Sequence, residues 1–123
     1  MKTNPVHWFE IYVQDMERAK AFYEQVLGVT LQRLGSHDLE MWGFPGGPGV
    51  SGSSGSLVRA PGVPSGGNST IVYFSCEDCA VEAGRVAAAG GKVHREKMGI
   101  GQYGYIVLAV DPDGNMIGLH SMK

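Results

Sequence analysis

The sequence predicts an α+β fold of two paired βαβββ modules. Segments typical of strands alternate with one helix-like segment in each half of the chain. When the first half is shifted by 63 residues, Asp15 falls on Asp78 and Gly28 falls on Gly91. A helix start and a helix stop therefore repeat at the same spacing, which indicates an internal repeat.

Length and composition predict one folded domain. The chain has 123 residues, of which 43% are hydrophobic and 18% charged, enough to bury a core. We expect module 1 over about residues 1–60, a linker over about 61–69 and module 2 over about 70–123. Both cysteines are expected to be reduced, because two thiols make no disulfide scaffold.

Charge and hydropathy exclude two classes of partner. A formal net charge of −2 argues against nucleic acid, because phosphate binding needs clustered Lys and Arg. No apolar run approaches the roughly 18 residues of a membrane span. The first residues lack the apolar segment of a secretory signal, so we expect a cytoplasmic protein.

The first predicted strand covers residues 7–13, which are rich in aromatic and β-branched types. Side chains alternate along a strand, so Trp8, Glu10 and Tyr12 share one face. A carboxylate between two aromatic residues is a candidate general base, because desolvation could raise its pKa.

The remaining elements of module 1 follow from capping and periodicity. Asp15 is a predicted N-cap, and apolar residues at helical spacing predict a helix over 16–27 that ends at Gly28. Three further strands are expected over residues 29–33, 38–44 and 56–60.

Module 2 repeats this order. We expect a strand over residues 70–76, followed by a helix that begins after Asp78 and ends near Ala89. Residues 111–115 (DPDGN) have the composition of a tight turn. Strands are expected from Lys92 to Arg95 or beyond, over 105–110 and over 116–121.

These motifs together resemble the vicinal oxygen chelate superfamily, which includes glyoxalase I, bleomycin-resistance proteins and extradiol dioxygenases. The resemblance covers nearly the whole chain and is carried by residues 9–15, Arg18–Ala19, 21–23, 26–28, 72–74, Asp78, 89–93 and 111–115. It implies sheets that curl around a cleft, a small organic molecule as the ligand, and a homodimer.

The resemblance also implies metal-ligand positions, which we carried over one by one. The first-strand positions are Trp8 and Ile71, and the last-strand position of module 2 is Gly118. The fourth lies within residues 53–58, which contain no Asp, Glu or His. None of these side chains is a usual ligand of a divalent ion, so we predict no metal cofactor. If a divalent metal does bind, His7 and His120 are the first ligands to test.

We therefore predict that the chain binds a small organic molecule in an aromatic-lined cleft. The expected binding residues are Trp8, Glu10, Tyr73 and His120. The alternative is a lyase, isomerase or dioxygenase-type enzyme. It would use non-standard metal ligands, or no metal with Glu10 and His120 as the acid/base pair.

Two other patterns are weaker. Cys76 and Cys79 form a CxxC without a second pair, and the acids between them disfavour a redox role. Residues 47–52 and 99–104 both fit GxGxxG, but neither precedes a predicted helix. We expect these glycine-rich segments to be loops over the cleft.

Overall fold

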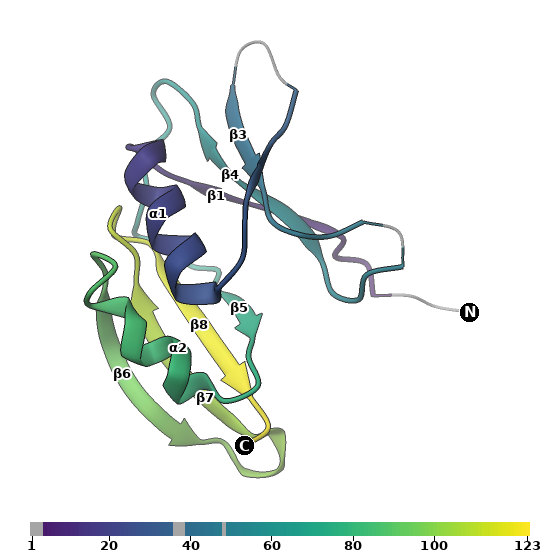
Figure 1. Cartoon of the computed structure of the whole chain (residues 1–123), viewed down its shortest axis with the longest axis vertical. Coiled ribbons are helices and arrows are strands. Elements are labelled where there is room, and N and C mark those ends of the chain that lie inside the picture. Colours follow the sequence, from purple (N-terminus) through teal and green to yellow (C-terminus); the bar gives the residue numbers. More distant parts are fainter. Residues whose placement is uncertain (1–3, 36–38, 48) are drawn as a thin grey trace.

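The computed structural model describes residues 4–35, 39–47 and 49–123. Within these residues the chain forms two four-stranded sheets and two α-helices (Figure 1). The predicted α+β fold with paired βαβββ modules is confirmed.

Each module contributes one sheet, and the two sheets have the same plan. The first has the order β1-β4-β3-β2, formed by β1 (Trp8–Tyr12), β4 (Ser54–Arg59), β3 (Glu40–Gly43) and β2 (Gln32–Arg33). The second has the order β5-β8-β7-β6, formed by β5 (Val72–Ser75), β8 (Met116–Ser121), β7 (Tyr105–Val110) and β6 (Lys92–Gly99). In both sheets the first strand of the module pairs in parallel with the last, and the other pairs are antiparallel.

The two helices begin at the predicted caps. α1 (Met16–Leu27) starts after Asp15, whose side chain accepts a hydrogen bond from the Arg18 N–H, and ends at Gly28 in the left-handed region (φ 67°). α2 (Cys79–Val86) starts after Asp78, whose side chain accepts from the Ala80 N–H.

Helix α2 is shorter than predicted. It ends at Val86 rather than near Ala89, and the Gly91 N–H donates to the Val86 carbonyl. A Cβ at Gly91 would lie 2.5 Å from the Phe22 ring and 2.6 Å from the Val110 carbonyl oxygen. The chain thus leaves the helix early to pass close to module 1, which only glycine permits.

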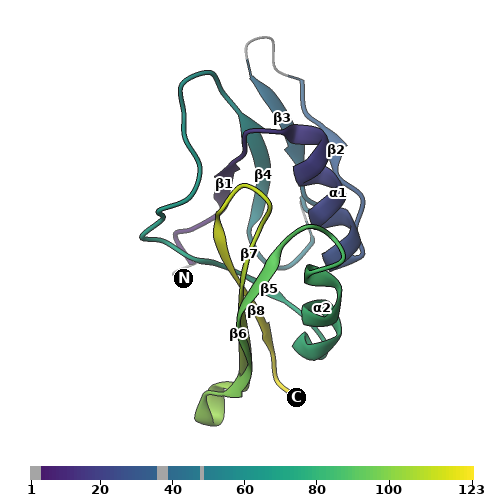
Figure 2. The same ribbon diagram turned by 90° about the vertical axis from the view of Figure 1, so that its left-hand side faces the viewer.

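Each sheet has a helix side and a helix-free side. Both helices lie on the same side of the molecule and contact each other (Figure 2). Residues of α1 and Val86 of α2 pack with both sheets in a main core that includes Ile11, Tyr23 and Ile117. The other buried residues of α2, Cys79 and Ala83, form a second cluster with Val107 and Leu119 of the second sheet. Phe9 and Ile11 of β1 face the main core. Trp8 and Glu10 alternate with them and are exposed, as the predicted alternation requires.

The turn after β7 connects the two modules through hydrogen bonds and a salt bridge. The Tyr23 hydroxyl donates to Asp111 Oδ2 at 2.7 Å, and both residues are buried. Asp113 Oδ1 accepts from the Gln14 N–H and forms a salt bridge with Arg18, both at 2.8 Å. The predicted linker also binds to this turn, because the Gly66 N–H donates a hydrogen bond to Asn115 Oδ1.

Candidate functional site

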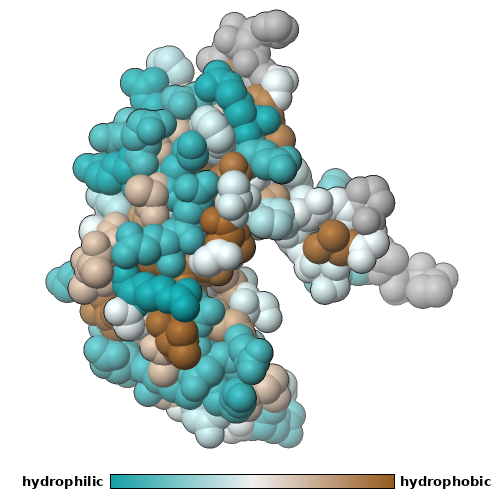
Figure 3. Space-filling view, in the orientation of Figure 1, coloured by the Kyte–Doolittle hydropathy of each residue, from teal (hydrophilic) through white to brown (hydrophobic). Residues whose placement is uncertain are grey.

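A pocket of about 680 Å³ is lined by residues of both sheets, and we call it the inter-sheet pocket. Module 1 contributes Trp8, Phe9 and Phe44, and module 2 contributes Tyr73 and Phe74. Figure 3 shows that the surface is hollowed between the arm formed by the first sheet and the rest of the molecule. This volume suits a small organic ligand.

The aromatic residues of this pocket have two different environments. Trp8 and Tyr73 are 42% and 47% exposed, respectively. Phe9, Phe44 and Phe74 pack against the core, and their ring centroids lie 5.4–6.1 Å from one another. Three fixed rings and two accessible ones offer a largely apolar contact surface for a flat molecule.

Helix α2 adds a carboxylate to the inter-sheet pocket. Glu82 lines the pocket, and its Oε1 is buried without a hydrogen-bond partner in the described part of the protein. Our sequence reasoning missed this residue. A signal was present, because Glu82 lies three residues after Cys79 and four before Val86, both fully buried. A charge within an apolar helical stripe marks a candidate site.

The Glu82 carboxylate also affects the pKa of the Cys76 thiol. Burial and the nearby Glu82 carboxylate raise the pKa of Cys76 from 9.0 to about 12, with desolvation as the larger cause. Cys76 and Cys79 are both free. Cys79 is fully buried at the start of α2, where its N–H donates to Ser121 Oγ at 3.0 Å.

A second pocket of about 520 Å³ lies on the helix-free side of the second sheet, and we call it the His120 pocket. It is lined by Tyr73, Ser75, Ile100, Tyr103, Ile106 and His120. Nε2 of His120 lies 2.6 Å from the Tyr103 carbonyl oxygen, in the short 3₁₀ turn η1 (Gly101–Tyr103). Tyr73 lines both pockets and thus separates them. The glycine-rich segment 99–104 is the β6–β7 connection beside this pocket.

Glu10 is fixed between its aromatic neighbours. Its carboxylate accepts from Trp8 Nε1 at 3.1 Å and from the Tyr12 hydroxyl at 2.7 Å. The hydrogen bond to Glu10, with a smaller effect of burial, raises the pKa of Tyr12. Glu10 lines a smaller pocket of about 280 Å³, which His120 does not line. The structure thus brings Trp8 together with Tyr73, and Tyr73 together with His120, but places Glu10 and His120 in different pockets. Their role as an acid/base pair stays a prediction.

The register of the sheets identifies the fourth metal-ligand position. Glu10 pairs with Ser56, and Tyr73 pairs with Gly118. Glu10 and Tyr73 each lie two residues after a first-strand position, so Ser56 is the counterpart of Gly118. A Cβ at Gly118 would lie 2.2 Å from the Tyr73 ring, which occupies the space of the expected carboxylate.

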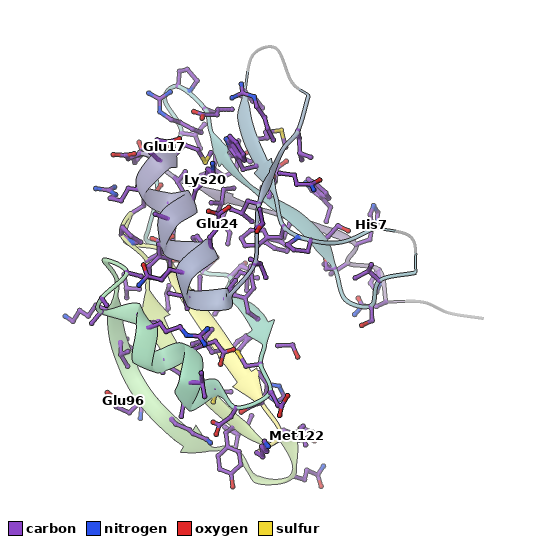
Figure 4. All side chains as sticks on the ribbon, viewed as in Figure 1. His7, Glu17, Lys20, Glu24, Glu96 and Met122 are labelled. Carbon is purple, nitrogen blue, oxygen red and sulfur yellow. The ribbon has the colours of Figure 1, made fainter. Side chains whose placement is uncertain are left out.

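The donor set does not fit the metal that the superfamily implies. Its four positions hold Trp8, Ile71, Ser56 and Gly118, and only serine offers an oxygen. Within the described residues, no group of three or more His, Cys, Asp and Glu side chains could hold a metal ion. His7 is exposed at the outer end of the first sheet, away from the second (Figure 4). His94 is also exposed, and His37 lies outside the described residues.

Two such modules with an aromatic pocket between them define the class of glyoxalase-like proteins. The family comparison gives the same result, since the model of the Glyoxalase/Bleomycin resistance protein/Dioxygenase superfamily matches residues 6–119. The chain belongs to this superfamily.

A curated relative from Mycobacterium tuberculosis (strain CDC 1551 / Oshkosh) is named "Putative glyoxylase CFP32". It is 31% identical over 124 residues, which cover 92% of this chain and 42% of that protein. The same values hold for the protein of that name from Mycobacterium bovis. The chain thus spans less than half the length of these relatives.

Two solved structures illustrate the range of similar proteins. The V278E mutant of glyoxalase I from Zea mays is 25% identical with a TM-score of 0.75, and the match covers 96% of this chain and 46% of that one. TnmS3, an antibiotic binding protein from Streptomyces sp. CB03234, is 26% identical with a TM-score of 0.72, and the match covers 98% of both chains. One relative by fold is therefore an enzyme and another is a binding protein.

In the described part of the chain, no helix is long and apolar enough to cross a membrane.

Proposed function

We propose that this protein binds a small, flat organic molecule in the inter-sheet pocket without a metal ion. The aromatic lining of this pocket is the observation that carries the proposal. Rings from both modules meet there, with Trp8 and Tyr73 accessible to a ligand. Apolar pockets with few polar groups are the usual sites for such molecules. The similarity to an antibiotic binding protein over 98% of both chains supports binding as the function.

The residues at the four metal-ligand positions are the reason to propose a function without a metal. Tyr73 lies over Gly118, so the side chain that would bind a metal is replaced by a ring that would contact the ligand. We expect less than about a tenth of an ion per chain, measured by elemental mass spectrometry after dialysis against nickel, zinc, iron(II) or manganese. About one tightly held ion per chain would contradict this part of the proposal.

The binding proposal is tested with a neutral aromatic probe, 1-naphthaleneethanol, by isothermal titration calorimetry. Trp8→Ala and Tyr73→Ala should each weaken binding by about five- to thirtyfold, because each removes a ring contact worth about 1–2 kcal/mol. Tyr105→Ala is the matched control, since Tyr105 is 38% exposed but lines neither pocket. Unchanged affinity in the Trp8 and Tyr73 variants, or no binding by the wild type, would refute the proposal.

We also infer that the protein is a homodimer. Exposed Tyr73 and Tyr103 both line the His120 pocket on the helix-free side of the second sheet. A second copy could cover part of this apolar surface. Light scattering coupled to size exclusion should give about twice the 13.1 kDa of one chain, and a monomer at all concentrations would exclude this inference.

A further inference from the structure

Among the described residues, the inter-sheet pocket contains one buried side-chain oxygen without a hydrogen-bond partner. Glu82 Oε1 is buried and receives no hydrogen bond from the described residues. A buried carboxylate oxygen without a donor is unfavourable, because it has lost its hydrogen bonds to water and gained none in return. A ligand that supplies a donor would remove this penalty when it binds.

No Lys, Arg or His of the described residues forms a salt bridge with this carboxylate. The salt bridges of the described residues join Arg18 to Asp113, Lys97 to Asp78 and Lys123 to Glu77, and none involves Glu82. Arg85, one turn further along α2, instead donates to the Val26 carbonyl at 3.1 Å. Burial, and then the charge of Glu82 and a hydrogen bond to it, raise the pKa of the nearby Cys76 thiol, a weak donor without positive charge. Oε1 of Glu82 is therefore available to a donor on a ligand.

The walls around Glu82 favour a cation over a neutral donor. Trp8, Phe9, Phe44, Tyr73 and Phe74 line the same pocket. The faces of aromatic rings attract cations, and this attraction increases when water is excluded. A carboxylate and several rings in one pocket thus complement a molecule that is both aromatic and positively charged.

We propose that Glu82 is the polar anchor of the inter-sheet pocket and that its ligand is an aromatic molecule carrying a protonated amine. The aromatic part contacts Trp8 and Tyr73, and the ammonium group donates to the Glu82 carboxylate. This assignment rests on the proposed binding function and adds the charge of the ligand. It gives the rings and the carboxylate separable roles, because the rings act on any aromatic ligand and Glu82 acts on the amine alone.

The test compares three probes that share one ring system: 2-(1-naphthyl)ethylamine, 1-naphthaleneethanol and 1-naphthaleneacetate. Calorimetry at neutral pH should show that the amine binds at least tenfold more tightly than the alcohol and that the anion binds most weakly. Glu82→Gln should reduce the affinity for the amine to that for the alcohol and leave the alcohol unchanged. Equal binding of amine and alcohol by the wild type would overturn the proposal.

Two further variants test other sources of charge preference. Glu96→Gln removes an exposed carboxylate of the second sheet (Figure 4) and is the control, which should keep the preference for the amine. Glu10→Gln removes the carboxylate that accepts from Trp8 and decides between the two candidate anchors. Loss of the preference in Glu10→Gln but not in Glu82→Gln would assign the anchor to Glu10 and refute our assignment.

A measurement on the wild-type protein tests the proposal even if a variant does not fold. In ¹H–¹⁵N spectra, the amine should shift the amide signals of residues 76–82 more than the alcohol does, while both shift those around Trp8 and Tyr73. Equal shifts at 76–82 from both probes would contradict the role of Glu82. Failure of all three probes to bind would refute the binding function itself, a result distinct from binding without charge preference.

Discussion

The two modules use the same strand pairing for opposite purposes. In module 1, Phe9 lies across Gly55 on the neighbouring strand, and a Cβ there would lie 2.3 Å from its ring. In module 2, Tyr73 lies across Gly118 in the same way, at 2.2 Å. Phe9 faces the core, whereas Tyr73 is 47% exposed and faces both pockets.

This difference shows how a repeated motif separates stability from binding. A ring that covers a glycine on the adjacent strand fills space that has no side chain of its own. On the core side the ring supports packing between the sheets. On the helix-free side it offers a surface to a ligand and excludes the carboxylate that a metal would need.

The largest expected effect is on stability, and it comes from removing the hydrogen bonds that connect the two modules. Asp111→Ala removes the acceptor of the Tyr23 hydroxyl and of the Asn115 and Asp113 N–H groups. Because these donors are then left unpaired, we expect a loss of about 3–4 kcal/mol in the free energy of unfolding, measured in urea. Tyr23→Phe, which removes one bond, should lose less. An Asp111→Ala loss under about 1 kcal/mol would show that the turn does not hold the modules together.

The next effect compares the two glycines directly. Gly55→Ala should destabilise the fold by about 3 kcal/mol, because Phe9 is packed on the core and has no room to move. Gly118→Ala should lose about 1 kcal/mol, because the exposed Tyr73 ring can turn away. Adding Tyr73→Ala to Gly118→Ala should recover most of this loss. Equal losses for the two glycine variants would remove the distinction between the modules.

A smaller effect concerns the hydrogen bonds on the exposed side of β1. Glu10 raises the pKa of Tyr12, so Glu10→Gln should move the Tyr12 transition down towards about 10 in a spectrophotometric titration. Since the folded-state pKa lies above the unfolded value, this contact stabilises the fold below pH 10. Its contribution is lost as the pH rises through the folded-state pKa. A Tyr12 transition that is the same in both proteins would place the carboxylate elsewhere.

The smallest effect, in energy, is a change in thiol reactivity beside the inter-sheet pocket. A Cys76 pKa of about 12 rather than 9.0 makes the thiolate about a thousandfold rarer at pH 8. Iodoacetamide should therefore modify native Cys76 far more slowly than the unfolded chain. Glu82→Gln should speed the reaction, because it removes a neighbouring negative charge. Mass spectrometry identifies the modified cysteine. An unchanged rate in Glu82→Gln would show that Glu82 does not influence the Cys76 thiol.

Much of the fold could be predicted from local signals. The bounds of α1 follow from Asp15 and Gly28, since both caps act within one turn. The strands over 105–110 and 116–121 were predicted at the observed bounds, because long apolar segments flank a turn of clear composition. The strand expected over 29–33 is only the two-residue β2, because β2 is the edge strand of its sheet and pairs on one side only, with β3.

The candidate site was less predictable because it depends on the angle between two sheets. Alternation placed Trp8 and Glu10 on one face of β1. It carries no information on which module that face meets. Glu82 was missed because its helix was interpreted through its alanines, and the burial of its Oε1 arises only when α2 packs on the second sheet. The separation of Glu10 from His120 has the same origin.

The turn at residues 111–115 also bears on how fast the chain folds. Its contacts with Gln14 and with the Tyr12 carbonyl join groups 99 and 103 residues apart. Bringing such distant segments together loses much chain entropy before any contact forms, and proteins rich in distant contacts fold slowly. We therefore expect each βαβ unit to form early, and the closure of the Asp111 turn on α1 to limit the rate.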